Sequence, residues 1–101
     1  MTNKHVKVAG MLYSVSEVEY VIIDGSVNYA GSCDYNNTHI EIREDLPQAR
    51  KDETFVHELM HAAFYEAGYD EHDEEMIDRV SKVWHQVLKD NPSLFGVLHN
   101  E

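Results

Sequence analysis

The sequence is poor in cysteine and in basic residues. Among its 101 residues there is one cysteine, Cys33, so an intramolecular disulfide is excluded and the composition fits a reducing compartment. Lys and Arg number 8 against 19 Asp and Glu, which gives a formal net charge of -11. We therefore expect binding neither to nucleic acid nor to an anionic membrane surface, because both attract positively charged proteins.

Long hydrophobic runs are also lacking. The N-terminal segment 1–7 is polar and leads into no apolar run of the length of a signal peptide or a membrane span, so we expect a cytoplasmic protein. The length suits one domain with a modest core, and residues 1–101 are expected to form a single domain. A domain with so small a core often needs an additional stabilising interaction, which a bound metal ion can supply.

The first part of the chain, 1–45, is predicted to be rich in β-strands. Turn residues such as Asp24-Gly25 separate short apolar runs, and in the run 38–43 Ile40 and Ile42 alternate with polar residues. The order of the strands stays open, and 16–20 is compatible with a strand or with a helical turn. The other expected strand runs are 5–9, 11–15, 18–23 and 26–29.

Two helices are predicted in the second half. The first covers about 47–67, because Pro47 suits a helix start and Gly68 suits a helix end. The second covers about 71–90 and is followed by a tail, 91–101. The face of the first helix expected to pack on the sheet consists of Val56, Leu59, Met60, Ala63 and Ala67. The apolar stripe of the second consists of Ile77, Val80, Val83, Trp84, Val87 and Leu88. These elements predict an α+β fold with a small, mainly antiparallel sheet.

The first predicted helix contains His57-Glu58-Leu59-Met60-His61, an H-E-x-x-H sequence. Residues four apart lie one above the other on a helix, so both imidazoles can bind one tetrahedral Zn2+ ion. Glu58, turned about 100° from His57, then stands beside the ion, where it can take a proton from an activated water. The pattern predicts a zinc site with Glu58 as the catalytic base. The alternative is that these histidines are ordinary hydrogen-bonded or solvent-facing residues.

A catalytic zinc site needs a third protein ligand, with the fourth position left to water. The candidates lie where the second helix starts, in an acidic run that is otherwise expected to cap and solvate the helix. If this helix packs antiparallel to the first, Glu74 is the best placed, because it precedes Ile77 by three residues on the apolar stripe. Asp73, Glu75 and His72 stay open as alternatives.

The chain resembles the short phage and mobile-element metallopeptidases of the ImmA/IrrE family, which are gluzincin-like zinc proteins. The resemblance is carried by segments 54–62 and 74–81, and more weakly by a β-rich front with Tyr29, Gly31, Asp34, Ile40 and Ile42. It implies a minimal zincin-like fold, a protein or peptide substrate, and a place in the host cytoplasm if a phage encodes the chain. It also implies Glu74 as the third ligand. In the family an Asn follows this glutamate at plus four, where this chain has Asp78.

Several further residues have two readings. Tyr65, four residues beyond His61, is a candidate for stabilising the transition-state oxyanion, although such a tyrosine more often only packs. Asp34 is either an acceptor for a ligand imidazole or, more commonly, a turn residue. Surface, hydrogen-bonding or packing roles are expected for His39, His85 and Cys33.

The predicted function is that of a zinc metalloendopeptidase that hydrolyses peptide bonds. The alternative function is that of a zinc-stabilised binding or regulatory protein without proteolytic turnover. The fourth coordination position separates them, because water there favours an enzyme and a protein side chain favours a structural site. A metal-free accessory protein is a third possibility.

Overall fold

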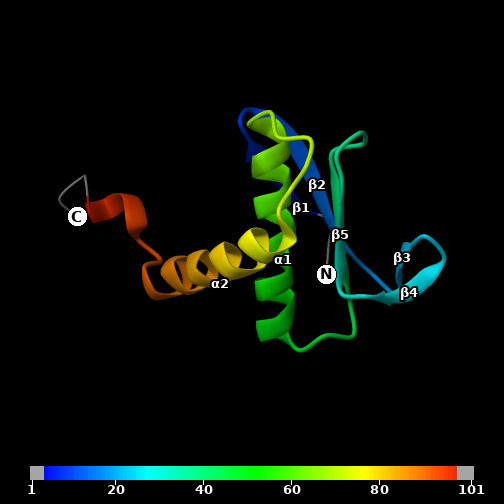
Figure 1. The fold of residues 1–101 in the computed structure, drawn as a ribbon. Coiled ribbons are helices and arrows are strands. Elements are labelled where there is room, and N and C mark those ends of the chain that lie inside the picture. The colour runs from blue at the N-terminus through cyan, green and yellow to red at the C-terminus, as the bar shows by residue number, and fades with distance from the viewer. Residues whose placement is uncertain (1–3, 98–101) are drawn as a thin grey trace.

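The computed structural model describes residues 4–97 and combines a mixed sheet, a separate hairpin and two helices (Figure 1). Neither helix has the length and apolar character needed to cross a lipid bilayer. The strands are β1 (Lys4–Val8), β2 (Met11–Val18), β3 (Val21–Ile23), β4 (Ser26–Tyr29), β5 (Gly31–Asp34) and β6 (His39–Arg43). The helices are α1 (Gln48–Glu66), α2 (Glu74–Asp90) and a short 3-10 helix, η1 (Leu94–Val97).

The main sheet has the strand order β1-β2-β6-β5. β1 and β5 are antiparallel to their neighbours, whereas the central strands β2 and β6 are parallel. The hairpin β3–β4 turns at Asp24 and Gly25, whose φ angles of 50° and 81° are those that a tight hairpin turn requires. The segment 16–20 begins as the end of β2 and forms no helical turn. The α+β class with a mainly antiparallel sheet and two helices is confirmed.

The core lies between the sheet and α1, which covers one face of the sheet (Figure 1). Ile40 and Ile42 are almost completely buried, as the alternation along the strand predicts. Ile40 is the register partner of Val15 on β2, so the two central strands contribute to the same layer. The buried cluster consists of Val8, Tyr13, Val15, Ile40, Ile42 and Ala62.

The face of α1 that meets the sheet differs from the predicted one. Val56 is buried as predicted, but Ala63 and Ala67 are exposed. The side chains packed on the core are Phe55, Leu59 and Ala62, of which Leu59 was predicted. These follow the spacing i, i+4, i+7, and the large ring of Phe55 removes more apolar surface from water than an alanine does. The packing face is therefore rotated toward Phe55.

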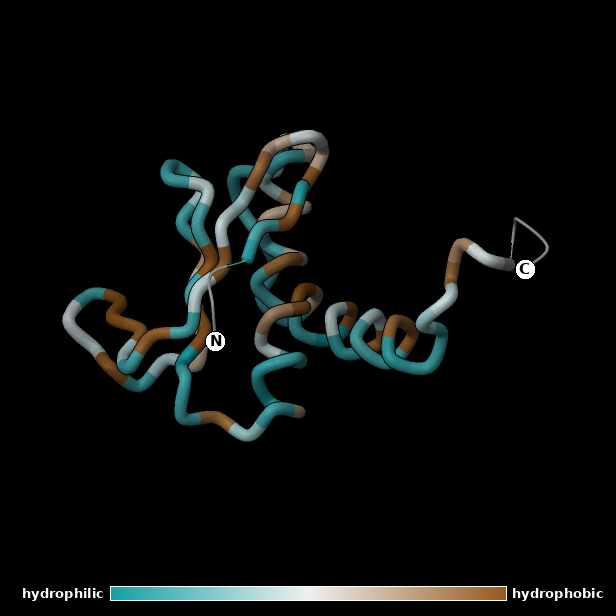
Figure 2. Tube along the Cα trace, turned by 180° about the vertical axis from the view of Figure 1, so that it is seen from behind, coloured by the Kyte–Doolittle hydropathy of each residue, from teal (hydrophilic) through white to brown (hydrophobic). Residues whose placement is uncertain are grey.

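The predicted packing of α2 is largely wrong. Its buried side chains are Ile77 and Ser81, near its start, whereas Val80, Val83, Trp84 and Leu88 are exposed. α2 runs across α1 and extends away from the sheet, instead of lying antiparallel along α1 (Figures 1 and 2). A helix that crosses another transversely touches it over a short segment only. The rest of the apolar stripe consequently has no contact with the core.

We expect Ile40→Ala to lower the free energy of unfolding by about 2–5 kcal/mol, because Ile40 is fully buried at the centre of the sheet. Urea denaturation followed by circular dichroism measures this loss. The matched control is Ile22→Ala on the hairpin, where the side chain is 64% exposed and the expected change is within about 0.5 kcal/mol. Equal losses in the two variants would contradict the placement of the core.

Candidate metal centre

The middle of α1 presents His57, Glu58 and His61 toward β5 and the start of α2. Their spacing along one helix places the two imidazole rings 5.1 Å apart, centroid to centroid. His61 and Glu58 are 8% and 9% exposed, which is unusual for such polar side chains. The two residues therefore lie within the packed interior, between the sheet and the second helix.

α2 completes the group with Glu74, its first residue. Oε1 of Glu74 lies 3.0 Å from Nε2 of His61. Ligand atoms of His57, His61 and Glu74 all lie within 4.8 Å of one another. Ligands of a tetrahedral zinc ion are about 3.3 Å apart, so small side-chain rotations would bring the three to one ion. Two imidazoles and a carboxylate are a donor set that suits zinc. These three residues are close enough to bind a metal ion.

The other candidates for the third ligand are engaged elsewhere. Asp73 caps α2, and its Oδ1 accepts a hydrogen bond from the backbone N–H of Met76 at 3.1 Å. The carboxylate of Glu75 lies 3.5 Å from Nε of Arg79 on the next turn. His72 contacts His61 rather than joining the group of three.

Asp78 lies next to the other ligand histidine. Its Oδ1 is 3.8 Å from Nδ1 of His57, one helical turn after Glu74. This separation is longer than a hydrogen bond. Asp34 is not in this position, because its carboxylate accepts two hydrogen bonds from Asn37, at 3.2 and 2.9 Å. The reading of Asp34 as a turn residue is confirmed.

Burial sets the acidity of Glu58. Desolvation raises the pKa of its carboxyl to about 7, and the negative charge of Glu74 adds to the increase. Gly31 on β5 allows this close packing, because a Cβ at that position would lie 3.2 Å from Cγ of Glu58 and 2.6 Å from Cγ2 of Thr54. A carboxyl with a pKa near neutrality is well suited to accept and return a proton.

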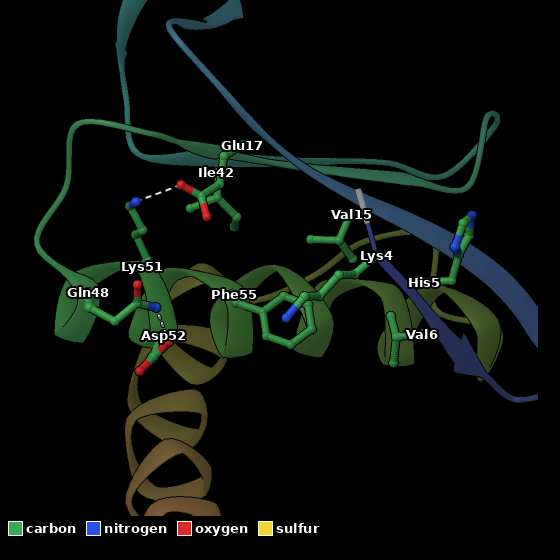
Figure 3. A pocket seen from close by; sticks show the side chains of 10 residues that line it. All are labelled: Lys4, His5, Val6, Val15, Glu17, Ile42, Gln48, Lys51, Asp52 and Phe55. Carbon is green, nitrogen blue, oxygen red and sulfur yellow. Dashed lines mark hydrogen bonds and ion pairs between the residues drawn. The ribbon is translucent and has the colours of Figure 1, made fainter. Parts of the chain in front are cut away.

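A cavity of about 220 Å³ adjoins the cluster. His57 and Glu58 line one side of it, Tyr29 and Gly31 another, and Asp78 and Ser81 of α2 a third. A second, larger cavity of about 370 Å³ lies between β1, β2 and the first half of α1 (Figure 3). No described residue lines both, and of these two cavities the smaller one is lined by residues of the cluster.

The polar side chains in the larger cavity largely pair with each other. The Lys51 ammonium pairs with the carboxylate of Glu17, and the Gln48 amide donates to Asp52 at 2.8 Å (Figure 3). The rest of the lining consists of Lys4, His5 and apolar side chains, among them Val15 and Phe55. These pairings give the larger cavity no group that converges on a reacting centre.

Two aromatic residues stand beside the cluster. Tyr65, the predicted oxyanion stabiliser, stacks on Tyr35 with ring centroids 4.5 Å apart, and its catalytic role stays a prediction. The hydroxyl of Tyr35 lies 3.4 Å from Nδ1 of His72. Neither Tyr35 nor the contact between His61 and His72 was predicted from the sequence, because both depend on the conformation of loops.

Comparisons of the chain with protein-family models, with curated proteins and with solved structures found no match.

We expect Gly31→Ala to lower the free energy of unfolding by about 1–3 kcal/mol, because the added methyl group overlaps Cγ2 of Thr54. Chemical denaturation measures the change. In the double variant with Thr54→Ser, the overlapping methyl is absent and much of the stability should return. A double variant no more stable than Gly31→Ala alone would argue against this steric cause.

We expect Glu58→Gln to stabilise the metal-free protein at neutral pH but not at acidic pH. The folded-state pKa of about 7 exceeds the ordinary value of 4.5, so stability is fully present below pH 4.5 and is lost as pH rises toward 7. Glutamine cannot ionise, so the variant should be more stable by about 2 kcal/mol above pH 7. Thermal melts with a chelator at several pH values measure this, with Glu75→Gln as control. A pH-independent difference would contradict the raised pKa.

Proposed function

We propose that this chain is a zinc-dependent metallopeptidase that hydrolyses peptide bonds. The metal ligands in this proposal are His57, His61 and Glu74, and the general base is Glu58. The observation that carries it is the convergence of these three ligand groups beside a buried carboxyl and an accessible cavity. The resemblance to the ImmA/IrrE metallopeptidases, which rests on the same residues, supports it.

A bound zinc ion would supply Lewis acidity, which polarises a substrate carbonyl and makes a water molecule easier to deprotonate. Glu58 takes a proton from the attacking water while the oxygen of that water bonds to the carbonyl carbon. The C–N bond then breaks, and Glu58 returns the proton to the departing amine nitrogen. Both transfers suit a carboxyl whose pKa lies near neutral pH.

The cavity beside His57 and Glu58 is where the scissile peptide would lie. Its volume of about 220 Å³ is smaller than that of typical ligand sites. It therefore suits one or two side chains of an extended peptide rather than a whole small molecule. A protein or peptide is therefore the proposed substrate class. Asp78 also lines this cavity, beside His57.

We expect the purified chain to bind one zinc ion, and Glu58→Gln to keep the zinc but lose hydrolysis by about 100-fold or more, the usual contribution of a general base. Zinc content is measured by elemental analysis of protein prepared without chelators. Hydrolysis is measured with a quenched fluorescent peptide library. Glu75→Gln is the matched control, since its side chain is 74% exposed and pairs only with Arg79. This control should retain both zinc and activity.

Three outcomes would count against the proposal in different ways. A parent chain that holds no zinc would overturn it altogether. A Glu58→Gln variant that cleaves as fast as the parent would remove the general-base role. A parent that binds zinc tightly but cleaves no member of the library would favour the alternative of a zinc-stabilised binding protein.

A further inference from the structure

His72, in the loop between α1 and α2, makes two polar contacts through its two ring nitrogens. Its Nε2 lies 2.9 Å from the backbone carbonyl oxygen of Tyr69. Its Nδ1 lies 2.8 Å from Nδ1 of His61. Both separations are those of well-formed hydrogen bonds.

The first contact determines the direction of the second. A carbonyl oxygen can only accept, so Nε2 of His72 must carry the hydrogen and donate it to Tyr69. In a neutral imidazole the other nitrogen is then an acceptor, which leaves Nδ1 of His72 with a lone pair. His61 must consequently donate through its Nδ1–H, and its own lone pair lies on Nε2.

This lone pair points to the place where the proposed metal would bind. Nε2 of His61 faces Oε1 of Glu74 at 3.0 Å, so a proton or a metal ion must lie between these two acceptors. We infer that His72 is a positioning residue, which fixes the His61 ring in the Nδ1–H form and so presents Nε2 to the metal. The inference rests on the proposed metal site and adds a residue to it.

The ring of His72 is held in this orientation by its neighbours. It lies edge to edge with the His61 ring, with centroids 5.1 Å apart and an angle of 23° between the planes, and the rings of Tyr35 and Phe64 each meet it edge-on at 5.7 Å. The Tyr35 hydroxyl, 3.4 Å from the same Nδ1, makes a much longer contact than His61 does. Packing by these two aromatic rings therefore keeps Nδ1 of His72 directed at His61.

The same geometry argues against His72 as a metal ligand. Nδ1 and Nε2 lie on different edges of an imidazole ring, and His72 meets the Nδ1 edge of His61 whereas Glu74 meets the Nε2 edge. His72 thus stands behind the ligand.

The test compares zinc affinity in the full-length parent and in three variants, by competition with a chromophoric chelator at one pH. His72→Leu removes the acceptor and should weaken zinc binding by about 10–100-fold. In His72→Asn, the side-chain oxygen occupies nearly the place of the ring Nδ1, so most of the affinity should return. His85→Leu makes the same substitution on α2, outside the cluster, and should bind zinc like the parent.

A second readout needs no variant and detects the hydrogen positions directly. Long-range ¹H–¹⁵N correlation spectra of the zinc-loaded parent should show the hydrogen of His61 on Nδ1 and that of His72 on Nε2. A merely structural role of His72 would lower stability without fixing this tautomer or being restored by asparagine. Circular dichroism of each variant confirms that it is folded.

Several results would overturn the inference. These are an unchanged zinc affinity in His72→Leu, a spectrum with the His61 hydrogen on Nε2, or a zinc-bound nitrogen on His72. The proposed function fails separately: a parent that binds zinc through this arrangement but cleaves nothing would keep the role of His72 and remove the peptidase. A parent that binds no zinc would remove both.

Discussion

The close packing of β5 against α1 at Gly31 is the constraint on which the site depends. Without a side chain at this position, the edge strand lies against Thr54 and Glu58, and the carboxyl of Glu58 is removed from water. The same packing directs the histidine side of α1 toward the start of α2. The absence of a Cβ at Gly31 thus affects the packing of the sheet, the pKa of the proposed base and the location of the proposed metal ligands.

Without a bound cation, burying the ionisable side chains of the cluster is electrostatically unfavourable. Burial raises the pKa of Glu58 and lowers that of His61, so both side chains are pushed toward their neutral forms. The nearby carboxylate of Glu74 raises the pKa of Glu58 further. A divalent ion would relieve this repulsion and add binding free energy to the stability of a small fold. Stability and chemistry would therefore depend on the same four side chains.

The features that sequence predicted well are local ones. The spacing of His57 and His61 on a helix, and the alternation of Ile40 and Ile42 on a strand, follow from the geometry of a single element. The parallel pairing of β2 and β6 was not predictable, because it depends on how the intervening hairpin folds out of the sheet. The transverse course of α2 likewise depends on the α1–α2 loop, which is why the burial of its apolar stripe was wrongly predicted. The contact between His61 and His72 arises from this same loop.

The attachment of α2 by its first two turns has a mechanical consequence. Glu74, the proposed ligand, is the first residue of the helix, and its buried residues Ile77 and Ser81 follow within two turns. The helix is therefore attached at the end that lies beside the cluster, and its other end projects away. A helix of 17 residues is about 25 Å long, and a tilt of about 10° at the attached end would displace its far end by about 4 Å. A small tilt at the cluster would thereby produce a larger displacement at the far end of the helix.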